Sequence, residues 1–114
     1  IMPINARSKG AGGEREAAAW LEEQGFEARR GQQFAGGPDS PDVVCDEFPF
    51  HLEVKRVENS SPMKWLGKAT EDAGGVKPPL ILWRPNRKPW VAVLWAKDLI
   101  PLVNGSLPWA YQVR

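Results

Sequence analysis

Hydrophobic and polar positions change their spacing several times along the chain, and each change marks a predicted element. Apolar residues recur at helical spacing in two segments and alternate or cluster in short runs elsewhere. The helical segments run from about residue 13 to 24 and from 62 to about 73, and glycine follows each of them. The other runs predict strands at 26–30, 42–45, 50–57, 80–83 and 90–95, and a short helical turn at 98–103.

The order of these segments is a helix, three strands, a second helix and two more strands before the helical turn. Mixed helices and strands of this kind predict an α/β domain. Residues 1–12 contain Arg7 and Lys9 among glycines without an apolar period, so we expect a flexible basic arm there. Residues 31–41 are rich in glycine and proline and predict a loop. No repeat or linker divides the chain, and residues 1–114 are expected to form one domain.

The composition is ordinary for a globular domain, with 42% apolar and 25% charged residues among 114. No run approaches the roughly 18 apolar residues of a membrane span, so no membrane partner is expected. The single cysteine, Cys45, argues against a disulfide framework or a cysteine-based zinc site and fits a reducing cytoplasm. The net charge of +1 disfavours a nucleic-acid binder, unless clustered carboxylates hold divalent cations and make the surface more positive.

One carboxylate falls where the helical pattern predicts apolar side chains. In the helix at 13–24, Glu14 shares a face with Ala17, Ala18 and Leu21. An unpaired carboxylate against a core is costly, so Glu14 is expected to have a partner. The alternative is that Glu14 only stabilises the first turn through the helix dipole.

The strand at 50–57 alternates strictly between apolar and polar residues. Because Phe50 and Val54 face the predicted core, Glu53 and Lys55 share the opposite face, about 6.5–7 Å apart along the strand. A carboxylate beside an ammonium suits metal binding and water activation, although a salt bridge on a half-exposed sheet gives the same pattern. His51 lies on this face too, and we interpret it as a sheet neighbour rather than a catalytic base, because the chain has no second histidine.

A second carboxylate precedes the neighbouring strand. Asp42 stands eleven residues before Glu53, at the start of the apolar run 42–45. If the two strands are neighbours, a turn at 46–47 brings Asp42 opposite the Glu53 region. With Glu14 reaching in from the helix, the three carboxylates would form an oxygen-only site, which suits Mg²⁺ or Mn²⁺ rather than zinc.

Two short motifs extend this picture. Pro41-Asp42 followed by Glu53-Val54-Lys55 resembles the PD-(D/E)XK nuclease motif. The segments KGAGGER at 9–15 and GFEARR at 25–30 are similar to those of archaeal-type Holliday junction resolvases of that superfamily and their phage-encoded relatives. The resemblance covers about residues 9–57.

In these resolvases a lysine-glycine pair precedes a glutamate on a helix, and an arginine follows it. Glu14 matches the glutamate, Arg15 the arginine, and Arg30 a second arginine at the end of the first strand. The resemblance implies a PD-(D/E)XK nuclease-like mixed central sheet flanked by helices. It also implies the cytoplasm as location, or the host cytoplasm for a phage-encoded protein.

The implied activity is metal-dependent phosphodiester hydrolysis. Asp42, Glu53 and the main-chain carbonyl of Val54 would bind Mg²⁺, for which Mn²⁺ would substitute, and Glu14 would complete the site or hold a water. Lys55 would orient the attacking water. The residues expected to bind DNA are Lys9, Arg15, Arg30, Ser40, Arg56, Lys64 and Lys68.

Two positions depart from the family pattern. Pro38-Asp39 also matches the first half of the motif, and Asp42 is preferred because an apolar strand follows it directly. Related nucleases often carry a glutamine on the second helix, whereas this helix carries Lys64 and Lys68.

Resolution of a four-way junction needs two symmetric nicks, and one domain of this size carries one site. We therefore expect a homodimer on branched DNA. Six tryptophans, at 20, 65, 83, 90, 95 and 109, offer material for an interface, with Trp83 and Trp95 expected in the core. The alternatives are an endonuclease for flaps, ends or a duplex site, an inactive DNA-binding module, and a small domain whose charges form surface salt bridges.

Overall fold

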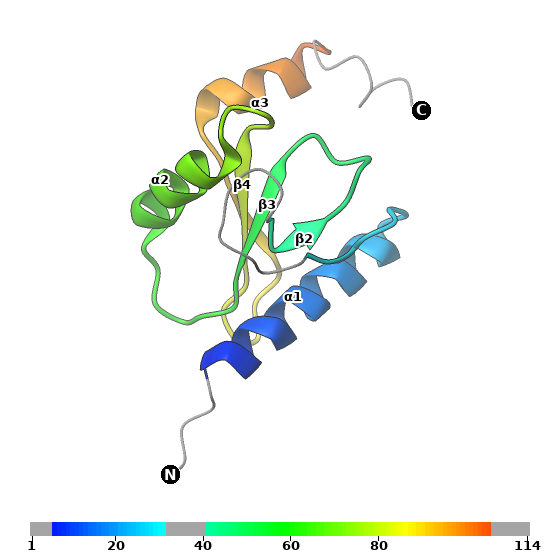
Figure 1. Ribbon diagram of the computed structural model, residues 1–114, viewed down its shortest axis with the longest axis vertical. Coiled ribbons are helices and arrows are strands. Elements are labelled where there is room, and N and C mark those ends of the chain that lie inside the picture. The colour runs from blue at the N-terminus through cyan, green and yellow to red at the C-terminus, as the bar shows by residue number, and fades with distance from the viewer. Residues whose placement is uncertain (1–5, 32–40, 106–114) are drawn as a thin grey trace.

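The computed structural model describes residues 6–31 and 41–105, except for the side chains of residues 6–9. Asp39, Ser40, Trp109 and the side chains of Arg7 and Lys9 therefore lie outside what is described. The elements are α1 (Ala6–Glu23), β1 (Arg29–Arg30), β2 (Val43–Val44), β3 (His51–Lys55), α2 (Pro62–Ala73), β4 (Pro79–Trp83), β5 (Val91–Val93) and α3 (Ala96–Val103) (Figure 1).

The strands form a five-stranded mixed sheet in the order β1-β2-β3-β4-β5. Neighbours are antiparallel except β3 and β4, which are parallel and connected by α2. A crossover helix is the usual way to join parallel neighbours. The predicted order of helices and strands is thus confirmed, and so is the mixed central sheet flanked by helices.

The sheet has a hydrophobic core on each face. Leu80 and Leu82 of β4 join the core beneath α1, whereas Ile81 between them packs against α2. Since successive side chains of a strand point to opposite faces, the two helices cover opposite faces of the sheet, as Figure 1 shows. α1 contacts β1, β2 and β3, and α2 contacts β3 and β4.

The first helix begins earlier than the sequence pattern predicts. α1 starts at Ala6, so residues 6–12, expected in a flexible arm, belong to the helix. The glycines in this stretch disfavour a helix by propensity, but Gly13 allows a close approach to β3. A Cβ on Gly13 would lie 2.7 Å from the Cβ of Arg56. Tertiary packing therefore overrides the local preference.

The second helix has the predicted ends. Pro62 occupies the first turn, and Gly74 ends α2 in the left-handed conformation, with a φ of 61°. Ser61 stands at the N-cap position without a side-chain cap hydrogen bond.

The described tryptophans pack against other residues of the same chain. The five described ones are all half-buried, and each packs against one of the two cores. Trp83 and Trp95, expected in the core, are only partly buried against the cluster that contains Ile81. Trp20 and Trp90 contact one another with ring centroids 6.3 Å apart.

Candidate active site

Asp42 and Glu53 are brought together by the pairing of β2 with β3. The two strands are antiparallel with Val43 opposite Leu52. The Asp42 N–H donates to the Leu52 carbonyl (2.9 Å), and the Val54 N–H donates to Asp42 Oδ2 (2.8 Å). The predicted neighbouring strands, and with them the approach of Asp42 to the Glu53 region, are confirmed.

The two carboxyl groups are close enough to hydrogen-bond one another. Burial, this hydrogen bond and the negative charge of Glu53 raise the pKa of Asp42 from its ordinary 3.8 to about 8. The Val54 N–H acts in the opposite direction, and Glu14 adds a smaller repulsion. Near neutral pH the metal-free pair therefore retains a proton.

Glu14 lies on the core-facing side of α1, and its residue is 8% exposed. Arg30 Nε donates to Glu14 Oε1 at 2.6 Å, which supplies the partner that the helical pattern required. Because α1 begins at Ala6, Glu14 is not in the first turn, and the alternative of a purely dipole-stabilising glutamate is wrong.

The carboxylates of the site suit a magnesium ion that keeps several waters, rather than a metal ion whose ligands all come from the protein. Within 6–31 and 41–105, no group of three or more histidine, cysteine, aspartate or glutamate side chains is placed to hold a metal. Asp42 and Glu53 offer two carboxylates, and Glu14 is engaged with Arg30. Since Mg²⁺ commonly binds through one or two carboxylates and keeps several waters, a two-carboxylate site suits it.

The Val54 carbonyl can add a third oxygen to this pair. The Leu52 carbonyl and the Val54 N–H both bond to Asp42, so alternate main-chain groups of β3 face that residue. Because the N–H and C=O of one residue in a strand point to the same side, the Val54 carbonyl faces the same region.

Lys55 lies next to α2 at the end of β3. Its Nζ is 5.9 Å from the centre of the Trp65 ring, within the range of a cation–π contact. Trp65 in turn meets Trp83 edge to face. On α2, the pKa of the Lys68 ammonium is raised chiefly by its hydrogen bond with Asp72, and the negative charge of Glu53 raises it slightly further.

No protein-family model matches the chain, and neither does any curated protein sequence. Among solved structures it is similar to Hjc, a Holliday junction resolvase from the archaeal hyperthermophile Archaeoglobus fulgidus. The TM-score is 0.52 and the identity 22%, over 75% of this chain and 72% of that one. The chain has the Hjc fold.

On this Hjc-like fold, several of the basic residues expected to bind DNA already have acidic partners. Arg30 pairs with Glu14, and Lys68 pairs with Asp72 at 2.9 Å. Arg15 and Lys64 are exposed. Their role on DNA stays a prediction, as does that of Lys9 and Ser40.

Arg56, which was expected to bind DNA, forms more hydrogen bonds within the protein than the other expected DNA ligands that the structure describes. Its Nε bonds both oxygens of Glu16 (3.2 and 3.1 Å), and its Nη1 bonds the Arg84 carbonyl (3.0 Å) and Asn86 Oδ1 (2.9 Å). Glu16 also pairs with Arg84 Nη1. These contacts join α1 to the carboxyl ends of β3 and β4. Arg56 is thus part of an internal network.

The sequence pattern gave no indication of Glu16. Its partners lie 40 and 68 residues away, beyond any helical or strand period. His51, interpreted from the sequence as a sheet neighbour of Glu53, does contact it: its Nε2 lies 3.2 Å from Glu53 Oε1.

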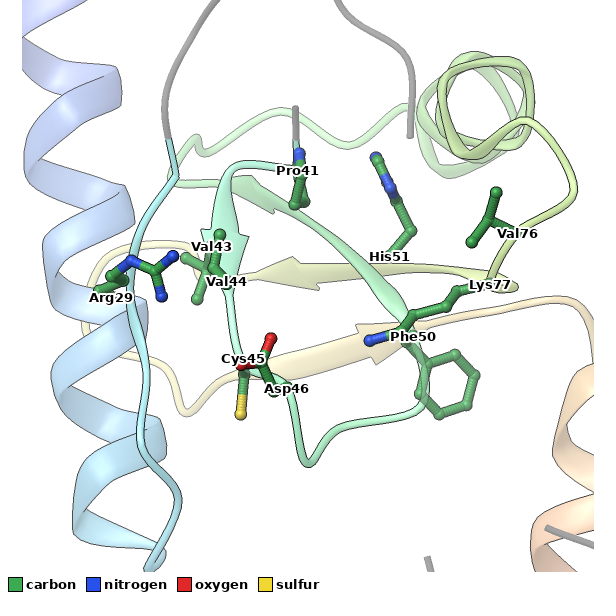
Figure 2. Close-up of a pocket in the computed structure, with 10 residues that line it drawn as sticks. All are labelled: Arg29, Pro41, Val43, Val44, Cys45, Asp46, Phe50, His51, Val76 and Lys77. Atoms are coloured by element: carbon green, nitrogen blue, oxygen red, sulfur yellow. The ribbon is translucent and has the colours of Figure 1, made fainter. Parts of the chain in front are cut away.

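A pocket of about 310 Å³ opens beside β2 and β3. Its lining includes the polar or charged residues Arg29, His51 and Lys77, together with Pro41 (Figure 2). Cys45 also lines it, is buried beside Val43 as expected, and burial raises the pKa of its thiol. This environment does not favour a nucleophilic thiolate.

Proposed function

We propose that the protein is a metal-dependent endonuclease that resolves four-way DNA junctions by paired symmetric nicks. The observation that supports this proposal best is the Asp42–Glu53 carboxyl pair on neighbouring strands, with Lys55 on the same strand as Glu53. The chain that carries this pair shares its fold with Hjc, which is a Holliday junction resolvase.

In this proposal Asp42, Glu53 and the Val54 carbonyl hold Mg²⁺, or Mn²⁺ in its place. The bound ion would neutralise phosphate charge and lower the pKa of the attacking water. Glu14, held by Arg30, would accept a hydrogen bond from a water of the site. Lys55 would orient the attacking water and stabilise the negative charge that develops on the phosphate.

Two nicks at one junction require two such sites, so the acting species is proposed to be a homodimer related by a two-fold axis. Exposed basic residues such as Arg15 and Lys64 would contact phosphates and position the junction without reading its sequence. The cytoplasm, or that of a host cell, is the proposed compartment.

The test compares cleavage of an end-labelled four-way junction with cleavage of a duplex of matching sequence. The full chain is incubated with Mg²⁺, with Mn²⁺ or with EDTA, next to the variants Asp42→Asn and Asp46→Asn. Asp46 is the matched control, because it is an exposed aspartate just beyond the same short strand. We expect symmetric nicks in the junction only, lost with EDTA and with Asp42→Asn and kept with Asp46→Asn.

Other outcomes assign other functions. Equal cutting of the duplex would indicate an endonuclease for another DNA substrate. Tight junction binding without cutting in either metal would indicate a DNA-binding module, and the proposed catalytic role of Asp42 would be wrong.

A further inference from the structure

His51 is the single histidine of the chain and the first residue of β3. Only 4% of the residue is exposed, and its Nε2 lies 3.2 Å from Glu53 Oε1. The two residues are two positions apart on one strand, so their side chains lie on the same face of the sheet.

The direction of this hydrogen bond follows from the state in which Glu53 binds a metal. A metal-bound Glu53 is ionised and can only accept, so His51 with its hydrogen on Nε2 donates to it. The Glu53 carboxylate is therefore held between His51 on one side and Asp42 on the other. Its side chain is 14% exposed, so little water is available to replace the histidine as a donor.

The position of the imidazole is itself constrained. The His51 N–H donates to the Pro78 carbonyl at 2.8 Å, which attaches the start of β3 to the segment entering β4. The side chain extends from β3 at the edge of the pocket beside β2 and β3 (Figure 2). The main chain that carries the ring is thus held in place, and the residue is almost fully buried.

We propose that His51 is a positioning residue that orients the Glu53 carboxylate for binding a divalent cation. The inference rests on the proposed function, because Glu53 needs orienting only if it is a metal ligand. Carboxylates that bind metals are commonly held by hydrogen bonds from residues that do not touch the metal, and loss of such a partner typically weakens metal binding about 10–100-fold.

A buried histidine that merely fills space would give the same burial but would not need a donor at the Nε2 position. Glutamine and asparagine separate the two roles. The side-chain amide of glutamine reaches about as far as Nε2, whereas that of asparagine corresponds to Nδ1. His51→Gln therefore keeps a donor near Glu53, His51→Asn moves it out of reach, and His51→Leu removes it.

The experiment is a calorimetric titration of the full chain with Mn²⁺, for wild type and the three variants, with thermal unfolding as the check on folding. We expect His51→Gln to bind Mn²⁺ nearly as tightly as wild type. His51→Asn and His51→Leu should bind it about 10–100-fold more weakly. Should His51→Leu fail to fold, the comparison between glutamine and asparagine, which are both polar amides, decides alone.

The outcomes separate this inference from the proposed function. If the wild type binds Mn²⁺ and His51→Asn and His51→Leu bind it equally well, the positioning role is wrong and the nuclease proposal stands. A folded His51→Gln that binds as weakly as His51→Asn would also overturn the role. If the wild type binds no Mn²⁺, both proposals fall.

Discussion

Asp42 destabilises the metal-free protein when it is ionised, because its carboxyl group is partly buried beside Glu53. Its pKa is raised from 3.8 to about 8, so the folded state binds a proton that the unfolded chain has already lost between these two pH values. Stability falls with rising pH wherever the folded state binds more protons. The contribution of Asp42 to folding therefore becomes less favourable from about pH 4 to pH 8 and is constant above that range.

We predict that Asp42→Asn is more stable than the wild type at pH 8 in the absence of metal. Asparagine is neutral and of the same shape, so it can still accept from the Val54 N–H. The difference in unfolding free energy should grow from near zero at pH 4 to a few kcal/mol at pH 8. Urea unfolding in EDTA across this pH range measures it.

Added Mg²⁺ serves as the control for this prediction. It should raise the stability of the wild type and leave Asp42→Asn unchanged, since ligands stabilise only the state that binds them. A wild type that is more stable than the variant at every pH in EDTA would contradict the assignment of Asp42 as a buried, repelled carboxylate.

At the scale of single residues, the sequence predicted the members of the site better than their contacts. Alternation along 50–57 placed Glu53 and Lys55 on one face, and the helical period placed Glu14 against the core. The partner of Glu14 was not assigned, because Arg30 reaches it across 16 residues. The bond from His51 to Glu53 depends on side-chain torsions, which a two-residue period does not determine.

At the scale of elements, the glycines of α1 provide a sharp comparison. Gly12 and Gly13 are neighbours, but a Cβ on Gly12 would meet nothing within 4 Å, whereas one on Gly13 would lie 2.7 Å from Arg56 Cβ. We predict that Gly12→Ala stabilises the protein by roughly 0.5–1 kcal/mol, because alanine favours a helix. Gly13→Ala should destabilise it by about 1–3 kcal/mol through overpacking.

Chemical denaturation of the two variants beside the wild type measures both effects. Because the residues are adjacent in one helix, any general influence of alanine on α1 appears in both variants and cancels in their difference. Equal stability of the two variants would mean that α1 does not approach Arg56 as closely as the structure has it.

The elements themselves differ in how well a sequence can predict them. α2 was predicted within a residue, because proline and glycine mark its two ends. β1 and β2 have two residues each, and their existence depends on pairing with each other and with β3 rather than on propensity. The start of α1 was placed too late, since its glycines indicate a loop by propensity and only contact with β3 reverses this.

At the scale of the whole molecule, the described helices include none long and apolar enough to cross a membrane. The apolar side chains that remain exposed gather partly on α3, which carries Leu99, Ile100 and Val103 and has no buried residue. Single exposed apolar residues are common, but several on one short helix are typical of an interaction surface.

We predict that the protein is a dimer and that α3 contributes to its interface. Light scattering should give twice the 12.7 kDa mass of one chain. Ile100→Glu should shift the equilibrium toward the monomer without unfolding the protein, because Ile100 is 56% exposed. Val76→Glu is the matched control, since Val76 is 71% exposed in the turn after α2 and should leave the mass unchanged.

A monomeric mass for the wild type at the concentrations used for cleavage would contradict the dimer. A dimer that Ile100→Glu leaves intact would place the interface elsewhere on the molecule.

The single carboxylate of Glu16 has a consequence for the ionic atmosphere around the protein. It partly neutralises the positive charges of two guanidinium groups, those of Arg56 and Arg84.

Each phosphate that a protein neutralises releases counterions and steepens the dependence of DNA affinity on salt by about 0.9 in logarithmic slope. Glu16→Gln should weaken the packing of α1 and should remove the negative charge that these two cations share, so that binding of a junction becomes tighter at low salt and falls more steeply as salt is added. Fluorescence anisotropy over a range of salt concentrations measures that slope. An unchanged slope would mean that both arginines stay bound within the molecule, and Glu16 would then set the stability of the protein but not its affinity for a polyanion.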